Sequence, residues 1–204
     1  MSKGWNVLIV KKDGNEAKQF ADGLKSIGAR ARIALNGQEA ILFTGERAPD
    51  LIITEVDLPM LDGLETGRFL KMKFSGRSVP ALIASAQSDV ETVENSALIG
   101  FEEFVAEPVE IDVIVASASG LLALGKAEND LIDLERRRAG SKKGLPPEED
   151  NSKELIETIC SLRAAVSERL LSRGFPELVA QHVERIARLD PDDVRLEALR
   201  AQLK

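Results

Sequence analysis

Side chains that bind metals or react with substrates are scarce in this sequence of 204 residues, which has one cysteine, one histidine and no tyrosine. Because Cys160 is alone, an intramolecular disulfide and a metal site built from several cysteines are both excluded. No apolar run approaches the roughly 20 residues of a membrane-spanning helix, and the residues after Met1 do not begin a signal peptide. These absences predict a cytoplasmic protein with no membrane insertion and no cofactor.

Positive charge is also in short supply, and the formal net charge is −7. Residues 1–125 contain 12 lysines and arginines against 18 acidic residues, while residues 151–204 contain nine of each. Binding to a phosphate backbone needs a clustered basic surface, which neither half provides. The composition therefore predicts no nucleic-acid partner.

Short apolar runs alternate with amphipathic stretches up to about residue 124. The runs are brief and bounded by Pro, Gly or Asp, which is typical of buried parallel strands, and the stretches between them have helical spacing. Asn15 is expected to cap the first helix. The pattern predicts an α/β domain with a doubly wound, five-stranded parallel sheet. The five expected strands are 7–10, 30–33, 51–53, 80–84 and 101–105.

Helical periodicity continues beyond this domain. We predict a division into an α/β domain at 1–124, a helical stalk and flexible linker at 125–150, and a small all-α module of about three helices at 151–204. A module of this size buries only a marginal core. It is therefore expected to pack on a partner, on a second copy or on the first domain.

The segment around the third predicted strand carries a recognisable pattern. The apolar run 51–53 is followed by Glu55, then by Pro59 and by Asp62-Gly63. This resembles the receiver domain of two-component response regulators, in which an apolar strand leads to an Asp and then to Pro-x-x-Asp-Gly. The resemblance covers about residues 5–124 and implies the receiver (flavodoxin-like) fold and a role in bacterial signal transduction by phosphorelay.

Receiver domains use an acidic pair to hold magnesium, an Asp to accept the phosphoryl group, and a hydroxyl and a Lys to bind the phosphoryl oxygens. The resemblance implies that these functions map, in that order, onto Lys11 and Lys12, Glu55, Ser85 and Glu107, and that an aromatic switch maps onto Phe104. Only the hydroxyl and the aromatic residue remain. The pattern thus implies a degenerate pseudo-receiver that is not an enzyme, with no catalytic residue and no metal.

The replaced residues balance in charge, since two lysines face two glutamates. We expect a lysine ammonium to lie roughly where the metal would lie, paired with Glu55 and with Glu107 as a second candidate partner. Asp13 is expected at the rim of this pocket, and it is a poor metal ligand beside two ammonium groups.

The function predicted from these features is that of a non-catalytic, phosphorylation-independent signalling adaptor or scaffold. Its partners are expected to be signalling proteins, with a homodimer left open, and the resemblance implies docking at residues 89–122. Four alternatives stay open: Glu55 as a mimic of a phosphorylated Asp, Asp57 as a relocated acceptor, His182 as a phosphotransfer residue, and a transcription regulator with a divergent helical output domain.

Overall fold

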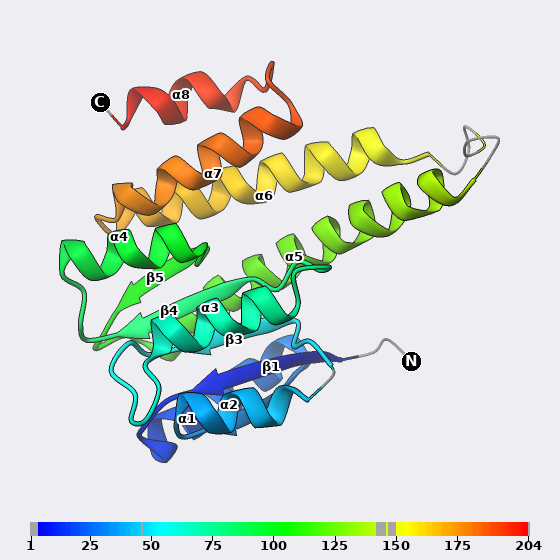
Figure 1. Ribbon diagram of the computed structural model, residues 1–204. Helices are drawn as coiled ribbons and strands as arrows, with labels where there is room; N and C mark the ends of the chain where they lie inside the picture. Colours follow the sequence, from blue (N-terminus) through cyan, green and yellow to red (C-terminus); the bar gives the residue numbers. More distant parts are fainter. Residues whose placement is uncertain (1–3, 46, 142–145, 147–149, 204) are drawn as a thin grey trace.

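Strands and helices alternate up to residue 140, and the regular elements described beyond it are all helices (Figure 1). The computed structural model describes residues 4–45, 47–141, 146 and 150–203. The strands are β1 (Trp5–Val10), β2 (Ala29–Ala34), β3 (Leu51–Thr54), β4 (Ala81–Ser85) and β5 (Glu103–Ala106). The helices are α1 (Gly14–Leu24), the 3-10 helix η1 (Lys25–Ile27), α2 (Gly37–Thr44), α3 (Gly63–Lys73), α4 (Val90–Ile99), α5 (Ile111–Gly140), α6 (Ser152–Ser172), α7 (Pro176–Leu189) and α8 (Arg195–Ala201).

The five strands form one parallel sheet in the order β2-β1-β3-β4-β5. Strands β3 and β4 are buried along their whole length, as their uninterrupted apolar character requires. Helices α1 and α5 pack together on one face, while α2, α3 and α4 follow one another on the other. The predicted doubly wound five-stranded sheet is confirmed.

Local sequence chemistry explains where the helices near the carboxyl ends of the strands begin. The Asp13 carboxylate accepts hydrogen bonds from the backbone amides of Asn15 (2.7 Å) and Glu16 (3.3 Å) and so caps α1. The expectation that Asn15 is the cap is wrong, because residue 15 already lies inside the helix. At the start of α3, a Cβ on Gly63 would lie 1.8 Å from the Glu55 carbonyl oxygen, so only glycine permits this close backbone approach.

The segment predicted as a stalk belongs to α5, a single helix of 30 residues. It does not stand free, because Ala127, Leu131 and Leu134 are buried and α6 packs along the helix. Most of the predicted linker lies outside the described residues, and the domain boundaries stay a prediction.

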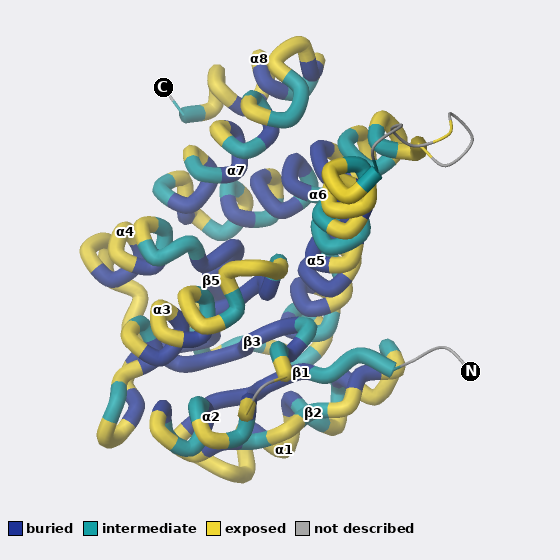
Figure 2. The backbone as a smooth tube through the Cα atoms, turned by 45° about the vertical axis from the view of Figure 1, so that its right-hand side comes forward, coloured by how far each residue is buried: buried dark blue, intermediate teal, exposed yellow. Residues whose placement is uncertain are grey.

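The helices after residue 150 pack on the receiver-like domain rather than lying apart from it. Helix α6 lies along α5 and contacts β5, α7 packs against α6 and α4, and α8 packs on α7 (Figure 1). Buried stretches of α6 and α7 are dark blue in Figure 2, above the β5 end of the sheet. The edge of the sheet at β5 is thereby covered by the chain itself. No helix in the described part of the chain combines the length and the apolar character that a membrane span needs.

Candidate functional site

Four of the residues singled out in the sequence meet at the carboxyl ends of the parallel strands, where α/β sheets place their sites. Lys11 follows β1, Glu55 follows β3, Ser85 ends β4 and Glu107 follows β5. We call Lys11, Glu55 and Glu107 the pocket cluster.

Lys11 is the centre of this cluster, and its side chain is completely buried. Its Nζ donates a hydrogen bond to Glu107 Oε1 at 2.7 Å and lies 3.3 Å from Glu16 Oε2 and 3.8 Å from Glu55 Oε2. The ring of Phe20 lies on another side, with its centroid 5.2 Å from the same nitrogen. One buried cation is therefore shared among three carboxylates, which meets the requirement that a buried charge be paired.

The acceptor and hydroxyl positions are both engaged with the backbone. Glu55 Oε1 accepts a hydrogen bond from the backbone amide of Lys12. The Ser85 hydroxyl oxygen accepts from the amides of Val56 (3.4 Å) and Gln87 (3.3 Å). Glu55 and Ser85 are both buried. Backbone amides supply the polar contacts of Ser85, and a backbone amide together with Lys11 supplies those of Glu55.

Two other predicted site residues do not join the cluster. The Lys12 side chain is about half exposed and pairs with exposed Asp57 at 2.5 Å, which raises the pKa of Lys12. Asp13 is exposed, and its carboxylate caps α1. Neither residue supplies a carboxylate or an ammonium to the buried pocket.

The donor set does not fit the magnesium ion that the receiver pattern implies. An ammonium lies among the carboxylates, where a cation would be repelled rather than bound. Within the described ranges, no group of three or more His, Cys, Asp or Glu residues is arranged to hold a metal ion. Burial raises the pKa of Glu107 above its ordinary value, and the hydrogen bond and charge of Lys11 only partly oppose this rise.

A second group of buried charges joins β5 to the C-terminal helices. Glu103 has a completely buried side chain that accepts hydrogen bonds from Arg169 Nη2 (2.9 Å) and Nε (3.1 Å), Arg173 Nη1 (2.5 Å) and the Ser117 hydroxyl (2.8 Å). Burial alone would raise its pKa, but these donors, led by Arg169, lower the pKa below its ordinary value.

The neighbouring Glu102 is held in the same way. Its carboxylate pairs with Lys71 and with Arg185 of α7, each at 3.0 Å, and accepts from the Ala81 amide at 2.7 Å. Burial opposes ionisation, yet the two cations and the amide lower the pKa of Glu102 to about 2. We call Glu102 and Glu103, with their three arginine partners, the interface cluster.

His182 completes the contact between α7 and β5 and is fully buried. Burial and the charge of Arg163 lower the pKa of His182 to about 3, so the ring is neutral. Its Nε2 then donates to the Glu102 carbonyl oxygen (2.8 Å), and its Nδ1 accepts from Arg163 Nη1 (3.2 Å). A phosphotransfer histidine must be reachable by a donor, so this geometry opposes the phosphotransfer alternative.

The switch aromatic and the expected docking face are also enclosed by the C-terminal helices. Phe104 is completely buried, and its ring lies 5.0 Å from that of Phe175, at an interplanar angle of 50°. The Gln181 amide donates to the Phe101 carbonyl oxygen at 2.5 Å. The resemblance implies docking at residues 89–122, and within that range α6 and α7 of the chain itself already cover β5.

Sequence reasoning did not find the interface cluster. Two glutamates in succession beside an otherwise apolar strand were a signal, because buried carboxylates need cationic partners. Arg169 and Arg173, four residues apart on one helical face, were the matching signal. The pairing itself joins positions 66 and 70 residues apart.

Residues 7–119 match the family model of the response regulator receiver domain. The transcriptional regulatory protein PrrA of Mycobacterium tuberculosis is 28% identical over 116 residues, which cover 57% of this chain and 49% of PrrA. The polar-differentiation response regulator DivK of Brucella anthropi is 27% identical over 120 residues, covering 57% of this chain and 95% of DivK. The chain thus spans about half the length of PrrA and nearly all of DivK.

Among solved structures, a signal receiver domain of a signal transduction histidine kinase from Syntrophus aciditrophicus is similar to this chain. It is 30% identical with a TM-score of 0.53, and the match covers 58% of this chain and 89% of that domain. The residues matched by the family model, 7–119, lie in the α/β part of the chain.

Proposed function

This chain belongs to the response regulator receiver domain family, and we propose that it is a non-catalytic, phosphorylation-independent signalling adaptor that acts through protein contacts. The observation that carries the proposal is the buried Lys11 ammonium, bonded to Glu107 at 2.7 Å and 3.8 Å from Glu55. A permanent cation in this place supplies the counter-charge for the pocket without metal or phosphate.

The chemistry of phosphoryl transfer explains why this arrangement opposes it. A receiver needs a free carboxylate as nucleophile, a divalent cation, and a Lys that binds the incoming oxygens. Here the Glu55 carboxylate is hydrogen-bonded to the Lys12 amide, and a glutamate stands in the Lys position. Two like charges 4 Å apart repel by about 4 kcal/mol near a protein surface, so Glu107 opposes an arriving phosphoryl group.

The partners are proposed to be signalling proteins, since receiver domains of response regulators interact with partner proteins. Because α6 and α7 cover β5, such a partner meets the exposed sides of α3, α4 and α7 rather than β5 itself. The outward side of α4 supports this view, since Val90 and Leu98 are 62% and 85% exposed.

Phosphorylation independence is tested on the full chain by recording amide NMR spectra during titration with magnesium and beryllofluoride. We expect no saturable shifts at Glu55 and Ser85. Such shifts would overturn the proposal. The variant K11D/K12D/E55D/E107K restores the residue types of the family pattern at these positions and serves as the matched control, in which saturable shifts are expected.

The relocated-acceptor alternative is tested by incubating the chain with acetyl phosphate and measuring the intact mass. We expect no gain of a phosphoryl group, because Asp57 is exposed, lies outside the buried pocket and has its carboxylate paired with Lys12. A gain that disappears in Asp57→Asn would establish that alternative. Partner capture from native cells with the full chain should likewise return the same proteins with and without acetyl phosphate.

The name of PrrA raises the transcription-regulator alternative, but its match covers only about half of that protein. Three arginines of the C-terminal helices face inward, since Arg163 pairs with Glu128, Arg169 with Glu103, and Arg185 with Glu102. Arginines in such pairs are not free to neutralise phosphates. A gel-shift titration at low salt is expected to show no complex.

A further inference from the structure

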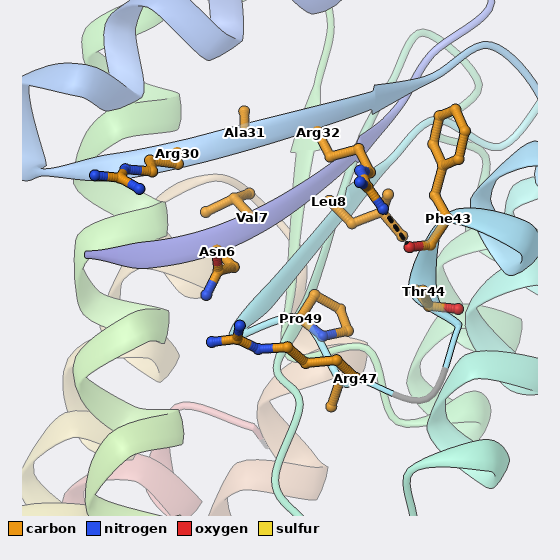
Figure 3. Close-up of a pocket in the computed structure, with 11 residues that line it drawn as sticks. Asn6, Val7, Leu8, Arg30, Ala31, Arg32, Phe43, Thr44, Arg47 and Pro49 are labelled. Carbon is orange, nitrogen blue, oxygen red and sulfur yellow. Dashed lines mark hydrogen bonds between the residues drawn. The ribbon is translucent and has the colours of Figure 1, made fainter. Parts of the chain in front are cut away.

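A pocket of about 280 Å³ lies at the beginning of β1 and β2, at the opposite end of the strands from the pocket cluster (Figure 3). It exists because α2 is short. The helix has eight residues and is about 12 Å long, whereas β2 has six residues and spans about 20 Å. The last turn of α2 reaches only as far as Arg32, so the beginning of β2 is left uncovered.

Three arginines line this pocket and come from two separate segments. Arg30 and Arg32 alternate on β2 and therefore point to the same face of the sheet. Arg47 comes from the connection between α2 and β3. No described residue of the lining is acidic, and none of the three guanidinium groups forms an ion pair within the described part of the chain. This concentration of positive charge stands out because residues 1–125 are acidic overall.

The three arginines are held in two different ways. Arg32 donates to the Phe43 carbonyl oxygen at 2.6 Å and lies 5.2 Å from the centroid of the Phe43 ring. In Figure 3, the guanidinium groups of Arg30 and Arg47 lie at the other end of the pocket, on either side of Asn6. The Asp50 carboxylate accepts from the backbone (2.8 Å) and side-chain (3.3 Å) nitrogens of Asn6 and forms no ion pair with these arginines among the described residues.

We propose that this pocket binds a small phosphate anion, either inorganic phosphate or the phosphate group of a small monoester. Arg30 and Arg47 are the binding residues, because each guanidinium can give two parallel hydrogen bonds to phosphate oxygens. Arg32 is a positioning residue that closes the end near α2. The side chains of Leu8, Ala48 and Pro49 line the apolar part of the walls. The volume admits a phosphate with a few carbon atoms and not a dinucleotide.

The test is an amide NMR titration of the full chain with sodium phosphate at constant ionic strength. We expect saturable shifts at Asn6, Arg30 and Arg47 at phosphate concentrations up to about 1 mM. Shifts that centre on Ser85 would overturn this inference and would also contradict the proposed function, because they would place phosphate at the pocket cluster. A lack of any saturable shift would overturn this inference alone. Equal shifts with sodium acetate would also overturn it, because they would show unspecific charge screening.

Single substitutions then test which arginines bind the phosphate. Arg30→Gln and Arg47→Gln are each expected to weaken phosphate binding about tenfold or more, the usual effect of losing charge-assisted hydrogen bonds. Arg200→Gln removes the same charge from an exposed position on α8 and should leave the affinity unchanged. If all three variants bind phosphate equally well, the inference is wrong.

A parallel titration with glycerol phosphate separates the two sources of the anion. Tighter binding of the monoester assigns the pocket to phosphorylated small molecules, and equal affinity assigns it to inorganic phosphate. Because the side chains of Arg30 and Arg47 are exposed, these variants should fold, and a well-dispersed amide spectrum checks this.

Discussion

The pocket cluster and the interface cluster contain the same kinds of groups in opposite proportions. In the pocket cluster and around it, Lys11 is one cation among three carboxylates. In the interface cluster, Glu103 has two arginine partners, and Glu102 has Arg185 together with Lys71 from outside the cluster. Burial raises the pKa of Glu107, and its single cation Lys11 only partly opposes this rise, whereas the cations around Glu102 lower the pKa of Glu102 to about 2. The number of cationic partners decides whether the effect of burial on the pKa of a buried carboxylate is overcome.

The two clusters also connect different parts of the chain. The pocket cluster links the ends of β1, β3 and β5 within the receiver fold, whereas the interface cluster fastens α6 and α7 to β5. Disruption of the first should change a local site. Disruption of the second should loosen the C-terminal helices as a unit.

The largest effect is expected when Glu103 loses its charge. In Glu103→Gln, Arg169 and Arg173 stay partly buried without a carboxylate, and breaking a buried ion pair in this way costs about 3–5 kcal/mol. Urea unfolding followed by circular dichroism measures the loss. Glu94→Gln on the exposed side of α4 is the control and should change the free energy of unfolding by less than about 0.5 kcal/mol. A loss no larger than that of the control would contradict the role of Glu103.

A smaller loss is expected for Lys11→Met, which leaves Glu55 and Glu107 facing each other. Removing one charged hydrogen-bond partner costs about 2 kcal/mol at neutral pH. Because the pKa of Glu107 is already raised, its protonation should relieve part of this loss at pH 5. Urea unfolding at both pH values measures the difference, with exposed Lys25→Met as the control. A loss that is the same at both pH values would contradict the pairing.

The pH dependence should have opposite signs in the two clusters. The folded-state pKa of Glu102 lies near 2, below its ordinary value of 4.5, so its stabilising contribution is complete above pH 4.5 and is lost as the pH falls toward 2. Glu107 has a raised pKa, so its contribution is present below pH 4.5 and is lost as the pH rises through its folded-state pKa. Carboxyl carbon NMR titrations measure both. If Glu107 titrates below Glu102, the comparison fails.

The smallest effect is expected at the rim, where Asp13 acts as a helix cap. Asp13→Ala should lower the free energy of unfolding by about 1 kcal/mol, whereas Asp13→Asn should keep it, because asparagine caps helices equally well. Thermal unfolding compares the two variants. A loss in both would show that the charge of Asp13 matters for another reason.

Much of the receiver half could be predicted from the sequence because its signals are local. Short apolar runs bounded by turn residues mark strands β1, β3 and β4 in the chain, and parallel strands necessarily bring the residues after them to one edge. The identities of Lys11, Lys12, Glu55 and Glu107 implied a pocket with balanced charge, but only Lys11 of the two lysines enters the pocket, so one cation lies among the carboxylates. The expectation that both lysines face the glutamates is wrong for Lys12, because successive residues of an extended chain point to opposite sides, and only Lys11 points into the pocket.

Other features were decided by tertiary structure alone. Asn15 and Asp13 are both good capping residues, and the backbone geometry of Asp13 selected it. Glu103 and Arg169 are 66 residues apart, and no periodicity relates a strand to a helix at that distance. Amphipathic helices show which side must be buried and not what buries it. The sequence by itself determined the receiver fold and the replaced pocket residues; the covering of β5 depended on long-range charge pairing that only the folded chain brings together.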